Sequence, residues 1–396
     1  MKNVLFIQFY IKEIDIIRGI KNLGLLNGFS DTYNFCKNIG DFVWVDQDNA
    51  TNYIIPFSKG TVFISAFFIK NLVSATKWAK ENPDIKFVVG GPVVLLRNDV
   101  STLPNLFLER KSVEEYFNIP DFSNNWELDI SYIKHITNKF DKIQFSYTID
   151  SKCYWNKCTF CNYSIENNRK RKTIDFSFID KISFDGIKHI RFNTPGLTKN
   201  YIEKIMNKII PREDVIYNSL IRCDKPVYET LEYFLDKYKN TKAKFQFETG
   251  AEYPSNRILE HMQKGINVYD IRQTLSLLKR YENITNKVFF MTGWPYIIEN
   301  DLFELLDFCE KVKTLDFIQL HRVFCFPDTA MHEMYKDRLY EKIYEGGYYR
   351  GYVIKLTEKE LELSLKSEEA LKKLTKVVSD YYCSLNHTYD KDGETP

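Results

Sequence analysis

The chain has 396 residues, of which 44% are hydrophobic, and its 55 basic and 53 acidic residues leave a net charge of +2. This length predicts two or three domains with cores of their own. So balanced a charge gives no general attraction to nucleic acid or to a membrane surface. No apolar run approaches the roughly 18 residues of a membrane span. The first residues lack the pattern of a secretory signal, so we expect a cytoplasmic protein.

The first part of the chain alternates between apolar runs and helical patterns. The candidate strands are Asn3–Tyr10, Asp41–Val45, Gly60–Phe67 and Asp84–Val89, and a helix is predicted over Lys70–Glu81. Short buried strands that alternate with helices indicate a parallel sheet with helices on its faces. Gly90 and Gly91 follow the last of these strands, at the strand end where open α/β sheets bind ligands. A Gly-Gly-Pro sequence is also an ordinary turn, so this position alone assigns no ligand.

From Lys142 the alternation resumes. The candidate strands are Lys142–Ile149, Lys188–Asn193, Val215–Arg222, Lys244–Glu248, Lys287–Thr292 and Phe317–Phe324. The helices predicted between them include Ser255–Lys264, Asp270–Tyr281 and Asn300–Lys313. Repeated strand–helix units indicate a partial parallel barrel, which gathers its reactive groups at the carboxyl ends of the strands.

These patterns predict an α/β protein in four parts. Residues 1–117 form a Rossmann-like parallel-sheet domain, and residues 118–141 connect it to the next part. Residues 142–330 form a partial TIM-type (β/α)6 barrel, and residues 331–396 form a short, charged helical segment.

The most informative feature for chemistry is a cluster of three of the eight cysteines, Cys153, Cys158 and Cys161. Reduced thiols are expected in a chain without an export signal. Three thiolates this close can bind one iron–sulfur cluster and leave its fourth iron open. Structural zinc is the alternative, but it takes four ligands, usually as two pairs. The chain has no second Cys-x-x-Cys, and the next histidine after Cys161 is the distant His189, so we favour the iron–sulfur cluster.

The motif Cys153-x4-Cys158-x-Phe160-Cys161, directly after the first predicted barrel strand, resembles that of the radical S-adenosylmethionine (SAM) superfamily. That family usually spaces its cysteines C-x3-C-x2-C, so the first gap here is one residue longer. The resemblance implies a [4Fe-4S] cluster on the three cysteines, SAM on the open iron, and Phe160 beside the adenine. It also implies that an electron from a donor such as flavodoxin or ferredoxin cleaves SAM. The resulting 5'-deoxyadenosyl radical would abstract hydrogen from an unactivated carbon.

Other segments resemble the same family. The stretch from Phe247 to Gly265 is similar to a strand–loop–helix of one branch, in which Glu252 would contact SAM. Thr292-Gly293-Trp294-Pro295 resembles a Gly-x-Pro whose glycine, here Gly293, lets the backbone approach the adenine. For Glu252, the alternative is a carboxylate that stabilises a helix N-terminus.

Two further strand ends complete this resemblance. Phe192-Asn193-Thr-Pro-Gly196 occupies the place where the family contacts the SAM amino group, which makes Asn193 and Gly196 candidates. Arg222 would meet the carboxylate of SAM or a substrate anion, with a structural ion pair as the alternative.

The first domain resembles the cobalamin-binding domain of one radical SAM branch. The matching segments are Ile64-Ser65-Ala66, Phe87–Pro92, Phe107–Arg110 and Pro120-Asp-Phe122. The Gly-Glu that the family carries near the end of this domain is replaced by Glu109-Arg110. We therefore do not favour bound cobalamin, and we interpret Ser65, Gly90 and Gly91 as a remnant cobalamin site or a surface that docks a peptide.

Three functions remain open. The favoured one is a radical SAM enzyme that modifies a ribosomally synthesised peptide, for example by epimerisation. Cys325 and Cys383 are the candidate hydrogen donors for that reaction. The alternative for each of these single cysteines is packing in the core. The second is a cobalamin-dependent methyltransferase, and the third is a non-catalytic iron–sulfur or zinc protein. The expected partners are a peptide or small-molecule substrate and the electron donor. We interpret the basic run Arg169–Lys172 as solvated surface or a contact for an acidic leader peptide, not as a nucleic-acid site.

Overall fold

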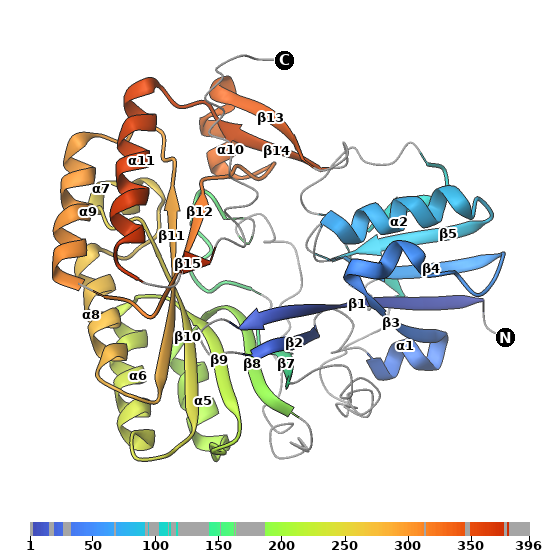
Figure 1. Cartoon of the computed structure of the whole chain (residues 1–396), viewed down its shortest axis with the longest axis horizontal. Helices are drawn as coiled ribbons and strands as arrows, with labels where there is room; N and C mark the ends of the chain where they lie inside the picture. Colours follow the sequence, from blue (N-terminus) through green and yellow to red (C-terminus); the bar gives the residue numbers. More distant parts are fainter. Residues whose placement is uncertain are drawn as a thin grey trace. The chain divides into compact units, whose positions relative to one another are not determined.

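The computed structural model (Figure 1) describes residues 3–15, 20–26, 33–66, 69–91, 94, 103–109, 111, 116–117, 142–150, 152–161, 163, 187–312, 314–344, 349–375 and 378–379. The chain divides into two compact units. The N-terminal unit comprises Met1–Ser151, Lys170–Asn193 and Ile343–Arg350. The C-terminal unit comprises Lys152–Arg169, Thr194–Lys342 and Gly351–Pro396. The predicted connector 118–141 and the basic run Arg169–Lys172 lie outside the described residues.

The N-terminal unit is built on a mainly parallel sheet. Its elements are β1 (Val4–Asp15), β2 (Ile20–Leu26), α1 (Tyr33–Ile39), β3 (Asp41–Asp46), β4 (Gly60–Ser65), α2 (Ile69–Glu81), β5 (Ile85–Gly90), β6 (Leu106–Leu108) and β7 (Lys142–Thr148). The first half of β1 lies between β3 and β4, and the parallel order continues through β5 to β6. The second half of β1 pairs antiparallel with β2, which pairs parallel with β7.

Both faces of this sheet are buried, as expected of parallel strands covered by helices. On one face, Leu5, Ile64 and Phe87 pack in one cluster with Trp78 of α2. On the other, Phe6 and its neighbours pack against Cys36 of α1. The alternation of Leu5 and Phe6 between two cores explains why the strand sequences read as continuous apolar runs.

The C-terminal unit contains consecutive strand–helix repeats. Its strands are β9 (Ile216–Ile221), β10 (Lys244–Glu252), β11 (Ile284–Thr292), β12 (Phe317–Arg322) and β15 (Val378–Ser379), all parallel to their neighbours in this order. Its helices are α5 (Lys199–Lys208), α6 (Lys225–Tyr238), α7 (Asn256–His261), α8 (Val268–Lys279), α9 (Glu299–Val312), α10 (Ala330–Met334) and α11 (Glu358–Lys372). Strand β8 (Ile187–Leu197) begins in the N-terminal unit, where it pairs with β7, and ends here.

Helix starts in this unit follow local sequence signals. Asn267 accepts a hydrogen bond from the backbone of Asp270, whose side chain accepts one from the backbone of Asn267, so the two form a capping box at α8. Thr357 and Glu360 form the same arrangement at α11. The strands β11 and β12 pack with these helices in one apolar core that includes Phe290 and Leu320.

The α/β architecture with parallel strands is confirmed, and the predicted strands and helices of both units lie within a few residues of the observed ones. Strand β2, which contains Asn22 and Gly24, has a weak strand pattern and escaped prediction. The expectation of a purely helical segment after residue 330 is wrong: strands β13 (Leu339–Tyr344) and β14 (Tyr349–Ile354) pair with each other there, and β15 joins the sheet beside β12. Aromatic and β-branched residues such as Tyr340 and Val353 favour these strands over a helix.

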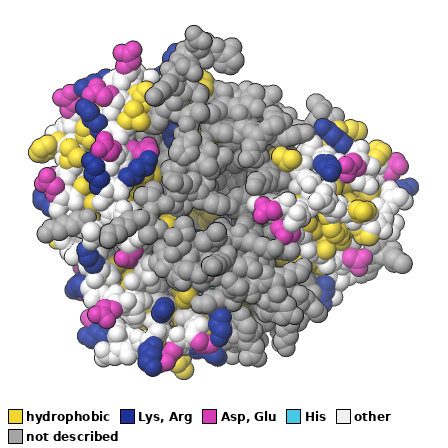
Figure 2. Space-filling model, viewed as in Figure 1, with side chains coloured by type: hydrophobic (Ala, Val, Ile, Leu, Met, Phe, Trp, Pro, Cys, Tyr) yellow, Lys and Arg dark blue, Asp and Glu magenta, His cyan; other side chains and the backbone are white. Residues whose placement is uncertain are grey.

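The surface carries charges of both signs. Figure 2 shows Lys and Arg side chains interspersed with Asp and Glu over the described part of the visible face. On α11 these charges form pairs one turn apart, such as Lys366 with Glu362 and Lys373 with Glu369. None of the helices in the described part of the chain combines the length and the apolar composition that crossing a bilayer requires.

Asp301 ties α7 and α9 together inside the C-terminal unit. Its carboxylate is fully buried and accepts hydrogen bonds from Ser255 Oγ at 2.7 Å and from the backbone N–H of Ile298 at 2.9 Å. It also forms an ion pair with Arg257. A buried carboxylate with this many partners matters for stability mainly because its removal leaves the surrounding polar and charged groups without hydrogen-bond partners.

We expect Asp301→Ala to lower the free energy of unfolding by about 3 kcal/mol, because it leaves a charged Arg257 and a buried hydroxyl without their partner. The measurement is the midpoint of urea unfolding. Glu310→Ala is the matched control on the same helix, because the Glu310 side chain is exposed, and it should shift the midpoint little. Equal shifts in the two variants would contradict this account.

Candidate functional site

The three clustered cysteines lie in a loop of the C-terminal unit, Lys152–Cys161, which we call the cysteine loop. Cys158 is buried, and Cys153 and Cys161 are partly buried. Burial raises the pKa of Cys161 to about 12. Burial also raises the pKa of Cys158, but the charges of Lys264 and Arg222 oppose that rise. In this buried environment the thiolate form of these cysteines is unfavourable unless a nearby positive charge stabilises it.

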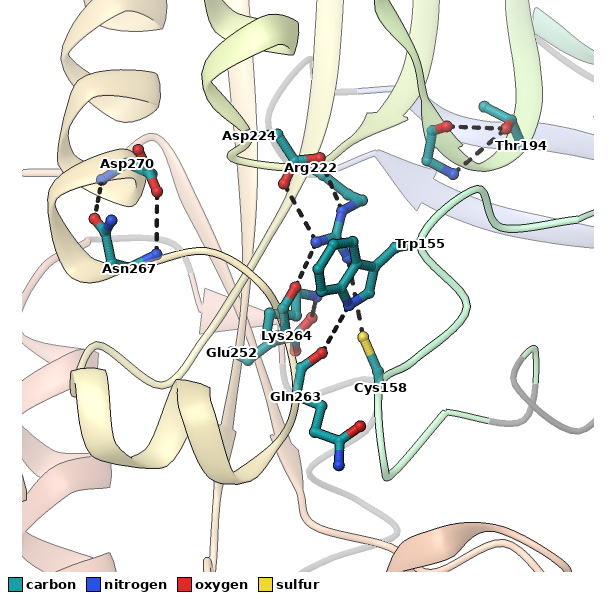
Figure 3. Close-up of polar contacts among 11 residues, drawn as sticks. Trp155, Cys158, Thr194, Arg222, Asp224, Glu252, Gln263, Lys264, Asn267 and Asp270 are labelled. Atoms are coloured by element: carbon teal, nitrogen blue, oxygen red, sulfur yellow. Dashed lines mark hydrogen bonds and ion pairs between the residues drawn. The ribbon is translucent and has the colours of Figure 1, made fainter.

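The cysteine loop is docked on the turn that follows α7 (Figure 3). Trp155 Nε1 donates a hydrogen bond to the carbonyl oxygen of Gln263 at 2.7 Å. The backbone N–H of Thr159 donates to the carbonyl oxygen of Met262 at 2.9 Å, and the carbonyl of Thr159 accepts from the backbone N–H of Met331 at 2.9 Å. Both ends of the loop segment between Cys153 and Cys161 are thus held by backbone groups of distant elements.

Gly265 makes this docking sterically feasible. Its φ is +70°, in the left-handed region that favours glycine. A Cβ at this position would lie 2.0 Å from Cζ2 of the Trp155 indole. The indole therefore occupies the space that any larger residue would fill.

Arg222, at the carboxyl end of β9, contacts several of the residues that form the site. It is 4% exposed. Its Nε and Nη2 donate to the two carboxylate oxygens of Asp224 at 3.0 and 3.2 Å, and Nη2 also donates to the carbonyl oxygen of Lys264. Its Nη1 donates to Cys158 Sγ at 3.9 Å (Figure 3).

Aromatic rings of the cysteine loop pack against the same guanidinium. The Arg222 Cζ atom lies 5.6 Å from the Tyr154 ring centroid and 5.3 Å from that of Trp155, within cation–π range. A Cβ on Gly196 would lie 3.2 Å from Arg222 Cγ and Cδ, so the glycine lets β8 approach this side chain closely.

A second buried cation, Lys264, also acts on Cys158, because its charge opposes the rise in the pKa of that thiol. Its ammonium forms an ion pair with Glu252 at 2.5 Å and lies 5.7 Å from the Phe160 ring centroid. Burial alone would lower the pKa of Lys264, but the charges of Glu252 and Cys158 outweigh it and raise that pKa above its usual range. Glu252 itself has a left-handed backbone, with φ of 59°, which turns its carboxylate toward this lysine.

An apolar wall continues from Phe160. Its ring packs edge-on against Trp294 with centroids 6.1 Å apart, and Trp294 directly follows Gly293 at the end of β11. The structure therefore brings Gly196, Arg222 and Glu252, at strand ends, around the cysteine loop that contains Phe160, and it places Gly293 at the end of the neighbouring strand.

Other predicted residues lie elsewhere. Cys325 is in the apolar core, where its backbone N–H donates to Tyr352 and burial raises its pKa to about 12. This environment fits the core alternative, and its role as hydrogen donor stays a prediction. Cys383 lies outside the described residues.

The remaining candidates belong to the N-terminal unit. Asn193 lies opposite Thr148 in the pairing of β7 with β8. Ser65 and Gly90 face each other in register at the carboxyl ends of β4 and β5, and Gly91 follows directly. This is the edge at which open parallel sheets bind ligands.

Sequence reasoning missed Trp155, Asp224 and Lys264 as parts of the site. Asp224 could have been found, because an acidic residue two positions after a strand-end arginine and just before a helix suits an ion pair at the N-cap. Trp155 and Lys264 carry no such local signal, since their partners are distant in the chain.

The donor set of the cysteine loop suits an iron–sulfur cluster, because it consists of thiols alone with buried cations beside one of them. Among the residues that the structure describes, no group of three or more His, Cys, Asp or Glu side chains is arranged to hold a metal ion. The fit therefore rests on the chemistry of the donors and on the charges of Arg222 and Lys264.

Comparison with known proteins gives a likeness in structure. No protein-family model and no curated protein sequence matches the chain. Two solved structures of the cobalamin-dependent S-adenosylmethionine radical enzyme OxsB match it, one with aqua-cobalamin and one with aqua-cobalamin and S-adenosylmethionine bound. Each aligns with a TM-score of 0.60 at 14% identity over 92% of this chain and 66% of the OxsB chain. The chain thus spans about two thirds of OxsB and shares its fold.

We expect Gly265→Ala to release the cysteine loop, because the left-handed backbone costs an alanine about 1–2 kcal/mol and the new methyl group overlaps Trp155. The measurement is the alkylation rate of Cys158 in metal-free protein, followed by peptide mass spectrometry, and a rise of roughly tenfold is expected. Gly90→Ala is the control, because its Cβ would meet only Glu109 O at 3.6 Å. Equal rates in the two variants would show that Gly265 does not hold the loop.

We expect Lys264→Met to lower the free energy of unfolding by about 3 kcal/mol, because it leaves the Glu252 carboxylate buried and unpaired. The double variant Lys264→Met/Glu252→Gln should recover part of that loss, since no uncompensated charge remains. Urea unfolding of metal-free wild type, both single variants and the double variant measures the coupling. Additive effects would contradict a coupled pair.

Proposed function

We propose that the protein is a radical SAM enzyme that abstracts hydrogen from an unactivated C–H bond in a ribosomally synthesised peptide. The observation that carries the proposal is the three-cysteine loop, held beside two buried cations at the strand ends of a fold shared with a radical SAM enzyme. The finer architecture belongs to the same proposal: residues 142–330 as a partial barrel and residues 1–117 as a cobalamin-binding-like domain.

Each residue of the site has a defined task in this proposal. Cys153, Cys158 and Cys161 would hold a [4Fe-4S] cluster, which supplies the electron for reductive cleavage and an open iron for SAM. Arg222 and Lys264 place positive charge beside the buried Cys158 and so stabilise its thiolate form.

The surrounding residues exclude water and shape the site. Phe160 and Trp294 form an apolar contact next to the cysteine loop, which protects a reactive radical from solvent. Gly196 leaves room for the Arg222 side chain. Glu252 engages Lys264, and its second oxygen is oriented by that ion pair for a polar contact with a bound cofactor.

The choice of a peptide as substrate does not follow from the residues of the site itself. It is supported by the short N-terminal unit, in which we do not favour bound cobalamin. Epimerisation of an α-carbon requires a hydrogen donor, for which Cys325 and Cys383 are the candidates. A flavodoxin or ferredoxin is the expected electron source, and a cytoplasmic location stays a prediction.

A cobalamin-dependent methyltransferase is the second candidate function. Two observations favour it: the structures that share this fold are of a cobalamin-dependent enzyme, and Ser65, Gly90 and Gly91 meet at a ligand-binding edge of the N-terminal sheet. Stoichiometric cobalt in protein produced with cobalamin would favour this reaction over epimerisation.

Anaerobic reconstitution with iron, sulfide and SAM tests the proposal. We expect about four iron atoms per chain, and 5'-deoxyadenosine after reduction, detected by mass spectrometry. Alanine at Cys153, Cys158 or Cys161 should abolish both results. Cys309→Ala is the control, because Cys309 lies on α9 and packs against the apolar core. Stoichiometric zinc, or iron without 5'-deoxyadenosine, would instead support a non-catalytic metal protein.

A further inference from the structure

Each nitrogen of the Arg222 guanidinium donates a hydrogen bond to another group of the protein. Nε and Nη2 face Asp224, Nη2 also reaches the Lys264 carbonyl, and Nη1 reaches Cys158 Sγ. The sequence suggested the carboxylate of SAM or a substrate anion as its partner. The structure instead gives its donors to Asp224, to the cysteine loop and to the turn on which that loop docks.

We infer that Arg222 is a positioning residue that orients Cys158 and raises the reduction potential of the cluster bound there. The inference rests on the proposed function, since it concerns the [4Fe-4S] cluster of that proposal.

The physical reason is the direction of one N–H bond. Reduction adds negative charge to the cluster and its sulfur ligands, so a donor aimed at Cys158 Sγ stabilises the reduced form more than the oxidised form. Hydrogen bonds to the sulfurs are among the factors that set cluster potentials. Because Arg222 is 4% exposed, its charge is poorly screened by water.

Asp224 moderates the same effect. Its carboxylate binds the Nε and Nη2 edge of the guanidinium, while Nη1 faces the sulfur. Its negative charge partly cancels the field of Arg222 at Cys158. Removing the arginine and removing the aspartate should therefore shift the cluster potential in opposite directions. A purely structural role of the pair would not produce opposite signs.

The chain supplies a matched control pair. Arg212 binds Asp214 through the same two nitrogens, with Nε at 3.1 Å and Nη2 at 3.3 Å, and the same spacing of two residues. This pair precedes β9, whereas Arg222 follows it, and Arg212 is 49% exposed. Arg212→Gln thus removes an equivalent ion pair from the opposite end of the strand.

The experiment is a redox titration of reconstituted protein without SAM, followed by electron paramagnetic resonance, together with iron analysis. It is run at pH 8, because burial raises the pKa of Asp224 to about 7 and the carboxylate must be charged. For Arg222→Gln we expect full iron content and, at the wild-type midpoint, a reduced-to-oxidised cluster ratio about tenfold lower, which corresponds to a downward shift of roughly 59 mV. Asp224→Asn should shift the midpoint upward, and Arg212→Gln should leave it unchanged.

The conservative variant Arg222→Lys separates charge from geometry, because lysine keeps the charge but cannot form the planar fork. Its midpoint should lie between those of wild type and Arg222→Gln. If Arg222→Gln loses iron, an upward shift in Asp224→Asn and a downward shift in Arg222→Lys still support the inference. Shifts of the same sign in Arg222→Gln and Asp224→Asn, or none beyond that of Arg212→Gln, would overturn it. A wild type without a reducible cluster would instead overturn the proposed function.

Discussion

The candidate site depends on a buried arginine whose charge has to be satisfied by protein groups, because the side chain is almost closed to solvent. Arg222 meets this requirement with one carboxylate, one backbone carbonyl and one thiol, each from a different segment. Because a guanidinium offers five donors in a rigid plane, each of these partners is constrained in direction as well as distance. The Arg222 side chain therefore connects strand β9, the turn after α7 and the cysteine loop.

The balance of charge around Cys158 follows from the same constraint. Two cations, Arg222 and Lys264, are buried together, and each has one carboxylate partner, Asp224 and Glu252. Buried ion pairs are poor sources of net stability, because desolvation offsets most of their attraction. Their effect on the neighbouring thiol is chemical: the two cations oppose the rise that burial causes in the pKa of Cys158, and so make a negatively charged sulfur less costly there. The apolar contact of Phe160 with Trp294 lowers the polarity of the surroundings, which strengthens the interactions between nearby charges.

The fold places this site by ordinary means. Parallel strands end at the same edge, so residues that close β8, β9, β10 and β11 gather without any specific attraction between them. Capping residues such as Asn267 start the helices directly after those ends. In the N-terminal unit the same rule brings Ser65 and Gly90 together, which explains why each unit carries a candidate ligand-binding edge.

Sequence alone determined the α/β class, the positions of the strands and helices that it predicted in both units, and the identity of the three clustered thiols. These features depend on local periodicity and spacing, which neighbouring residues encode. It did not determine strand β2, the pairing of β13 with β14, or the partners of Arg222 and Lys264. Trp155 and Gln263 are 108 positions apart, and no local pattern specifies that the indole of one docks on the carbonyl of the other. Only the tertiary structure decided those contacts, because buried polar groups form hydrogen bonds with the groups that the completed fold brings within bonding distance.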